Sequence, residues 1–123
     1  MKLNELRKLK CTPCPKGTSP LSRGQARERL STLTGWQLTG QAKSISKKFL
    51  MKDFSAAIAL MKAILPVAQA EDHHPDLHLT GYRKLQIVLS THEVVGLSDN
   101  DFILAAKIEA LPKALKAAEE SVG

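Results

Sequence analysis

All four histidines of this 123-residue chain lie between residues 73 and 92. His73 and His74 are adjacent and precede Pro75, and His92 follows the next strand-like stretch. Imidazoles titrate near neutral pH, so a cluster of them suits proton transfer. Three histidines with neighbouring acids could also bind zinc, or could form a cluster without a function. The residue types alone leave these three interpretations open.

The periodicity of apolar residues predicts the elements that must position the histidines. Three helices are expected to begin at the capping residues Ser22, Asp53 and Ser98. In chain order, we expect a helix ending at Gly35, strands over 36–39 and 45–51, a helix over 54–68 kinked at Pro66, a strand beginning at 77, a strand over 84–90, and a helix reaching about Ala118. Hairpins separated by helices predict an α+β fold, in which an antiparallel sheet carries helices on one face.

The second predicted hairpin explains how the histidines could meet. If its turn consists of Tyr82 and Arg83 alone, His73 falls opposite His92, with their Cβ atoms roughly 4.5–5.5 Å apart. A slip of one residue would break this pairing. His78 lies on the same strand without a partner in the sequence, and we expect it to be structural.

Charge is unevenly distributed along the chain. The net charge is +6, but residues 1–52 carry 12 Lys and Arg against 2 acids, whereas the remainder is acidic. The basic half could face an acidic partner or could simply be a solvated surface. Because no aromatic residues interleave with it, nucleic acid is a weak expectation. We find no apolar stretch near 18 residues and no apolar leader, so a cytoplasmic protein is expected.

The two cysteines form a single CxxC motif, Cys11-Thr12-Pro13-Cys14. We expect reduced thiols, with a shared metal site or a redox role as alternatives, because neither a second CxxC nor a preceding strand is present. Residues 1–20 are rich in proline and are expected to be an extended arm, and residues 21–123 a single domain.

The spacing of six residues resembles the pterin-4a-carbinolamine dehydratase family: His73, His74, Pro75, Tyr82, His92 and Asp101. Further segments are similar to its bacterial and chloroplast branch: 10–14, 20–21, 35–36 and 97–108. The resemblance extends over nearly the whole chain. It implies a four-stranded antiparallel sheet with three helices on one face, in the order α-β-β-α-β-β-α. It also implies association into dimers or tetramers, by extension of the sheet in many family members.

The resemblance implies the dehydration of 4a-hydroxytetrahydropterin without a metal or organic cofactor. It makes His73 and His92 the proton-transfer pair, with His74 assisting. Pro75, Tyr82 and Asp101 would contribute to the substrate site. Asp101 could instead cap the last helix, and Tyr82 could simply pack on the sheet.

One position departs from the family pattern. Four residues before His73 the family usually has glutamate, and this chain has Gln69, which would also line the substrate site. An amide cannot raise the pKa of a neighbouring imidazole as a carboxylate does. The departure, with the basic first half, keeps open a non-catalytic alternative known in the same family, assistance of RuBisCO assembly in carboxysome-containing bacteria and in chloroplasts.

Overall fold

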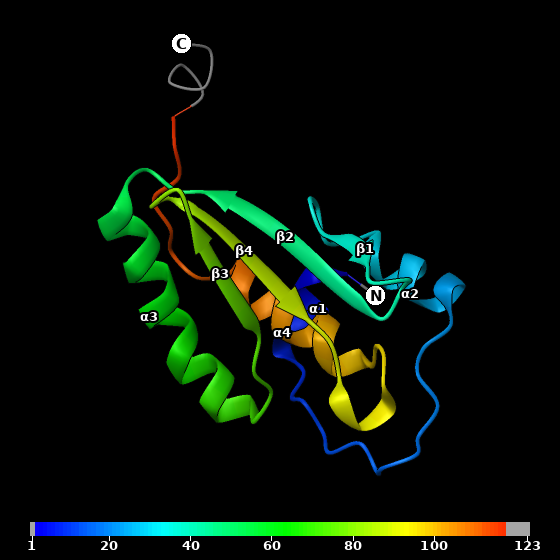
Figure 1. Cartoon of the computed structure of the whole chain (residues 1–123). Coiled ribbons are helices and arrows are strands. Elements are labelled where there is room, and N and C mark those ends of the chain that lie inside the picture. Colours follow the sequence, from blue (N-terminus) through cyan, green and yellow to red (C-terminus); the bar gives the residue numbers. More distant parts are fainter. Residues whose placement is uncertain (1, 118–123) are drawn as a thin grey trace.

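The computed structural model describes residues 2–117 and contains one four-stranded sheet with helices (Figure 1). In chain order the elements are α1 (Leu3–Lys8), α2 (Arg23–Leu30), β1 (Gln37–Thr39), β2 (Ser44–Leu50), α3 (Phe54–Glu71), β3 (Asp76–Thr80), β4 (Lys84–Leu89), the short 3₁₀ helix η1 (His92–Val94) and α4 (Asp99–Glu109). The expected α+β class is confirmed, and the expected elements occur in the expected order, preceded by the additional helix α1.

The sheet is antiparallel throughout, with the strand order β1-β2-β4-β3. Alternate side chains of β2 and β4 point into the core, and the helices pack on that same face. The core members from these two strands are Ile45, Phe49, Leu85, Ile87 and Leu89. The opposite face carries polar side chains such as Lys48, Gln86 and His78. The sheet therefore has one covered face and one open face.

The three predicted helix starts are confirmed. Ser22 and Ser98 each form a reciprocal capping box, with Gln25 and Asp101 respectively, and the Asp53 side chain accepts a hydrogen bond from the backbone N–H of Ala56. These signals were readable from sequence because a cap satisfies N–H groups only two or three residues away.

The expectations for the two ends of the chain need correction. Residues 3–8 of the expected extended arm form α1, which buries Leu6 against the core, and only the stretch after α1 is extended. The last helix ends at Glu109 instead of reaching Ala118, which lies outside the described residues. Pro112 explains the early end, because proline lacks the N–H that the next helical turn requires.

Helix α3 is longer than predicted and passes through Pro66 without a break. Its 18 residues are long and apolar enough to cross a membrane by length and composition alone, contrary to our reading of the sequence. In the fold it packs against the core through Ala57, Leu60 and Ile64, while most of its other side chains are partly or fully exposed.

The predicted register of the second hairpin is wrong by one residue. Leu77 faces Ile87 and Thr80 faces Lys84, so the turn has three residues, Gly81 to Arg83. Gly81 and Tyr82 both adopt positive φ, at 52° and 56°. Because pairing starts only at Asp76, His73 is not paired with His92 across the hairpin, and His92 begins η1.

Candidate active site

A buried carboxylate organises the centre of the histidine region. Asp101, on the first turn of α4, is fully buried. Its Oδ1 lies 2.7 Å from Nε2 of His73, and its Oδ2 accepts hydrogen bonds from the Thr91 hydroxyl at 2.8 Å and from the backbone N–H of Ser98 at 3.0 Å. The expected helix-capping role of Asp101 is confirmed, and the same side chain also contacts His73.

The contact with an ionised Asp101 determines which nitrogen of the His73 ring carries the proton. The ring is almost buried, at 9% exposed. An ionised carboxylate can only accept, so Nε2 of His73 carries the proton that points at Asp101. In the neutral ring, Nδ1 is then the nitrogen that can take up a proton.

His74 has a different hydrogen-bond partner from His73. Its Nε2 lies 2.7 Å from Oε1 of Gln69 on α3, so the residue that departs from the family pattern contacts a site histidine directly. The amide oxygen can orient the imidazole, but it carries no charge to stabilise the protonated ring.

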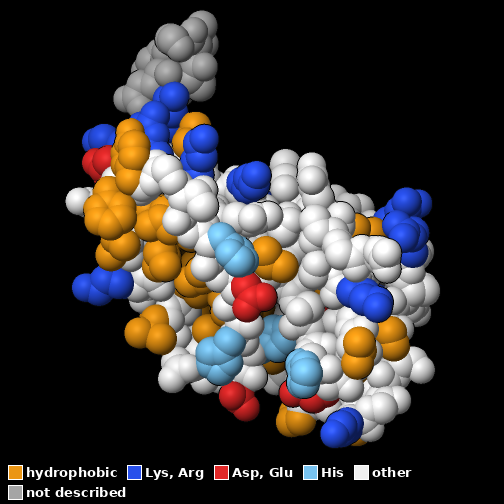
Figure 2. Space-filling model, viewed as in Figure 1, with side chains coloured by type: hydrophobic (Ala, Val, Ile, Leu, Met, Phe, Trp, Pro, Cys, Tyr) orange, Lys and Arg blue, Asp and Glu red, His pale blue; other side chains and the backbone are white. Residues whose placement is uncertain are grey.

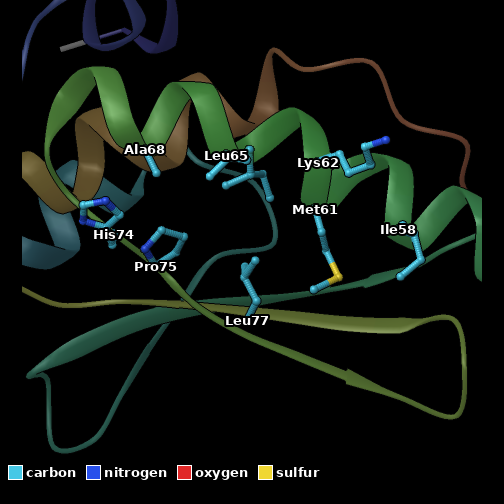
Figure 3. Close-up of a pocket in the computed structure, with 9 residues that line it drawn as sticks. Ile58, Met61, Lys62, Leu65, Ala68, His74, Pro75 and Leu77 are labelled. Carbon is cyan, nitrogen blue, oxygen red and sulfur yellow. The ribbon is translucent and has the colours of Figure 1, made fainter.

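His74 and Pro75 also form one end of an apolar groove of about 440 Å³ between α3 and β3 (Figure 3). Its other lining residues come from α3 and the start of β3: Ile58, Met61, Lys62, Ile64, Leu65, Ala68 and Leu77. Figure 2 shows the matching patch of hydrophobic side chains beside the histidines.

The structure places the three candidate histidines beside three different hollows. His73 lines a hollow of about 300 Å³, whereas the exposed His92 lines one of about 690 Å³ together with residues 16–20. Glu93 lines both of these hollows, so they are neighbours. Figure 2 shows the histidines gathered on one face with acidic side chains among them.

Tyr82 is not brought to the histidines. It lies in the β3–β4 turn, at the opposite end of β3 from His74, and is 58% exposed with its ring beside the Arg83 guanidinium. His78, expected to be structural, is exposed on the open face of the sheet.

The CxxC segment lies beside His73. Cys11, Thr12, Pro13 and Cys14 line the same 300 Å³ hollow, and both cysteines are free thiols. Burial, followed by the nearby Glu71 carboxylate, raises the pKa of Cys11 to about 12. Within residues 2–117, no group of three or more His, Cys, Asp or Glu side chains is arranged to hold a metal ion.

Sequence reasoning missed several residues that complete this region. Thr91 holds Asp101, while Glu71 and Asn100 hold the CxxC segment. Glu71 contacts Cys11, 60 positions away, and Asn100 contacts Thr12, 88 positions away, so no local sequence pattern could predict these contacts. The Ser98 contact alone was readable, as part of the predicted capping box.

An open antiparallel sheet with a histidine backed by a buried carboxylate defines an α+β protein with a candidate acid–base site. The chain belongs to the pterin 4 alpha carbinolamine dehydratase family, whose model matches residues 19–111. A "Putative pterin-4-alpha-carbinolamine dehydratase" from Halorhodospira halophila is 42% identical over 101 residues, covering 82% of this chain and 92% of the relative. The mitochondrial pterin-4-alpha-carbinolamine dehydratase 2 of Arabidopsis thaliana is 35% identical and covers 89% of this chain and 60% of the relative.

Two solved structures share the fold. A transcriptional coactivator/pterin dehydratase from Brucella melitensis has a TM-score of 0.70 at 32% identity, covering 75% of this chain and 97% of its own. A pterin dehydratase-like protein described as a RuBisCO assembly factor in the alpha-carboxysome has a TM-score of 0.53 at 18% identity, covering 63% of this chain and 89% of its own.

Proposed function

We propose that this protein dehydrates a 4a-hydroxytetrahydropterin to a quinonoid dihydropterin by histidine acid–base catalysis. The reaction expels the 4a-hydroxyl as water, which requires an acid at that oxygen and a base at a ring nitrogen. The observation that supports the proposal most directly is the 2.7 Å contact between His73 and the buried Asp101 beside a hollow. Membership of the family supports the substrate class.

In this proposal His73 is the base. Its proton on Nε2 is held by Asp101, so Nδ1 accepts the proton of the ring nitrogen and the carboxylate stabilises the charged ring. His92, in the neighbouring hollow, delivers the proton to the leaving hydroxyl. His74, oriented by Gln69, assists in binding. Proton transfer of this kind typically contributes about 10²–10⁴-fold each to the rate.

A dehydratase assay with 4a-hydroxytetrahydropterin tests the proposal. His73→Ala and His92→Ala should each reduce kcat by roughly 10²-fold or more, because each removes one proton-transfer group. His78→Ala is the matched control, since this exposed histidine on the sheet lies outside the three hollows. Wild-type protein without turnover, or a double His73→Ala, His92→Ala variant with unchanged kcat, would refute the proposal.

We also propose that α3 and the free edge of β3 form an interface between copies of this chain. Phe54 and Leu65 of α3 are 54% and 61% exposed, and β3 is paired on only one side. Exposed apolar patches and unpaired strand edges both favour association. Light scattering should give at least a dimer for the wild type and a smaller species for Leu65→Lys. Val95→Lys, at a 70% exposed site away from α3, is the control, and equal masses for all three proteins would contradict this interface.

The RuBisCO assembly alternative receives less support. The likeness to the assembly factor, at 18% identity, carries the fold and not the function. Of the lysines that could dock an acidic partner, Lys47 is already paired with Glu109 and donates to the backbone carbonyl of Thr34. Lys43 and Lys48 are exposed, as solvated surface lysines are.

A further inference from the structure

The segment Cys11-Thr12-Pro13-Cys14, called the thiol segment below, is held at its first two residues by side chains that lie close in sequence to His73 and Asp101. The backbone N–H of Cys11 donates to Oε1 of Glu71 at 2.7 Å, and Glu71 lies two residues before His73. The backbone N–H of Thr12 donates to Oδ1 of Asn100 at 3.0 Å, and Asn100 directly precedes Asp101. The start of the segment is therefore held by residues one or two positions away from the His73–Asp101 pair.

Asn100 makes most of the hydrogen bonds that hold the thiol segment. Besides accepting from Thr12, its amide donates to the Thr12 carbonyl at 2.7 Å and to Sγ of Cys14 at 3.6 Å, while its own carbonyl accepts from Sγ of Cys11 at 3.6 Å. The paired contacts to Thr12 resemble the exchange between two strand residues, which fixes both position and orientation. Asn100 is only 8% exposed, so these bonds are largely shielded from water.

The held segment forms one wall of the His73 hollow. His73 and the acidic residues Glu71, Asp72 and Glu93 also line this hollow. The hollow thus combines carboxylates with the small side chains of the thiol segment, and its volume of about 300 Å³ falls at the lower limit for small-molecule sites. A flat bicyclic ring with N–H groups along one edge suits this lining, since Asp72 and Glu93 can accept from the N–H edge, whereas Glu71 already accepts from Cys11.

The thiol segment lies outside the part of the chain that the family model matches, which begins at residue 19. We propose that this segment is a wall of the pterin site that limits the size of substrate admitted beside His73, and that Asn100 is the positioning residue that holds it. This inference rests on the proposed dehydratase function. It assigns to the CxxC motif a role in substrate fit that requires neither metal nor disulfide.

The first test separates binding from proton transfer. Asn100→Ala should raise KM by roughly tenfold while kcat changes by less than about twofold, because the lost contacts act on binding and not on the proton-transfer groups. The variant should also discriminate less between pterins with small and large side chains. Asp99→Asn is the matched control, because this exposed residue on the same turn pairs with Arg29 instead of the thiol segment.

A second variant protects the test against misfolding of Asn100→Ala. Thr12→Pro removes the Thr12 N–H that donates to Asn100, leaves α4 unchanged, and should shift KM in the same direction. If both variants fold but show an unchanged KM and unchanged discrimination between pterins with small and large side chains, the proposal that the thiol segment is a wall of the site is wrong.

A readout independent of turnover is the alkylation of the two thiols by iodoacetamide, resolved by peptide mass spectrometry. Oxidised biopterin, a stable pterin whose binding is followed by its fluorescence, should slow alkylation of Cys14 several-fold in the wild type. Cys11 should react slowly even without biopterin, because its raised pKa keeps it protonated. Asn100→Ala should speed the alkylation of Cys14.

The outcomes distinguish the two proposals. If the wild type turns over substrate and binds biopterin but Cys14 is not protected, the wall is wrong and the dehydratase function stands. If the wild type neither turns over substrate nor binds biopterin, both proposals fail. Turnover together with Cys14 protection and a KM effect in Asn100→Ala supports both.

Discussion

Replacing Asp101 with Asn changes the charge of one buried group and almost nothing of its shape. Asp101 accepts three hydrogen bonds, from His73, Thr91 and Ser98. A hydrogen bond to a charged group contributes about 1.5–3 kcal/mol and one between neutral groups about 0.5–1.5 kcal/mol, so each bond loses roughly 1 kcal/mol. Relief from burying a charge offsets part of this loss. We expect a net destabilisation of about 2 kcal/mol, or a fall in Tm of about 8 °C for a domain of this size.

The same substitution should reverse the tautomer of His73. The Asn oxygen continues to accept from Thr91 and Ser98, so its NH₂ group faces His73, whose Nε2 must then accept and whose proton moves to Nδ1. The proposed base is thereby blocked, and kcat should fall by about 10²-fold or more.

Thermal unfolding followed by circular dichroism, ¹⁵N NMR of the imidazoles and the dehydratase assay measure these three effects. Asp99→Asn, exposed on the same helical turn, is the control and should alter stability by no more than about 0.5 kcal/mol. An Asp101→Asn protein with wild-type Tm and the proton still on Nε2 of His73 would refute the reasoning.

Three further changes have expected outcomes. Gln69→Glu should raise the pKa of His74 through the new carboxylate and move one limb of the pH–rate profile to higher pH; an unchanged profile would place His74 outside the reaction. Because the folded state raises the pKa of Cys11 from 9.0 to about 12, the associated stability is present below pH 9 and is lost as pH rises towards 12. Cys11→Ala should therefore flatten the fall of Tm above pH 9, whereas Cys14→Ala should follow the wild type. Pro66→Ala should stabilise the protein by about 2 kcal/mol in urea unfolding, since Pro66 lies inside α3, and a loss of stability would contradict this estimate.

The parts of the fold that the sequence predicted are those controlled by neighbouring residues. The caps at Ser22, Asp53 and Ser98 act over two or three positions, and the pattern of β4 alternates regularly with burial. The hairpin register was not predictable because Gly81 permits either a two-residue or a three-residue turn. In the observed turn Tyr82 adopts a positive φ, which is typical of glycine or asparagine and is not expected from tyrosine.

The candidate site divides in the same way. The pairing of His73 with Asp101 crosses 28 residues and was not predicted, because the family resemblance placed the two residues only in the same site. The predicted pairing of His73 with His92 followed from a register that the structure contradicts. Helix α1 was missed because a helix of six residues is not stable by itself. Its stability comes from the packing of Leu6 in the core, which the local sequence does not reveal.

The double duty of Asp101 has a consequence for how this site can change over evolutionary time. The carboxylate that orients His73 also caps α4 and accepts from the backbone of Ser98. A descendant without the proposed dehydratase activity would still lose stability on replacing Asp101, so selection for folding alone would retain this residue. His92 and Gln69 are exposed and have no comparable role in stabilising the fold, so substitutions at these two positions would be tolerated. Loss of the proposed activity in such a lineage would therefore appear first as substitutions at these exposed positions, while the buried His73–Asp101 pair persisted.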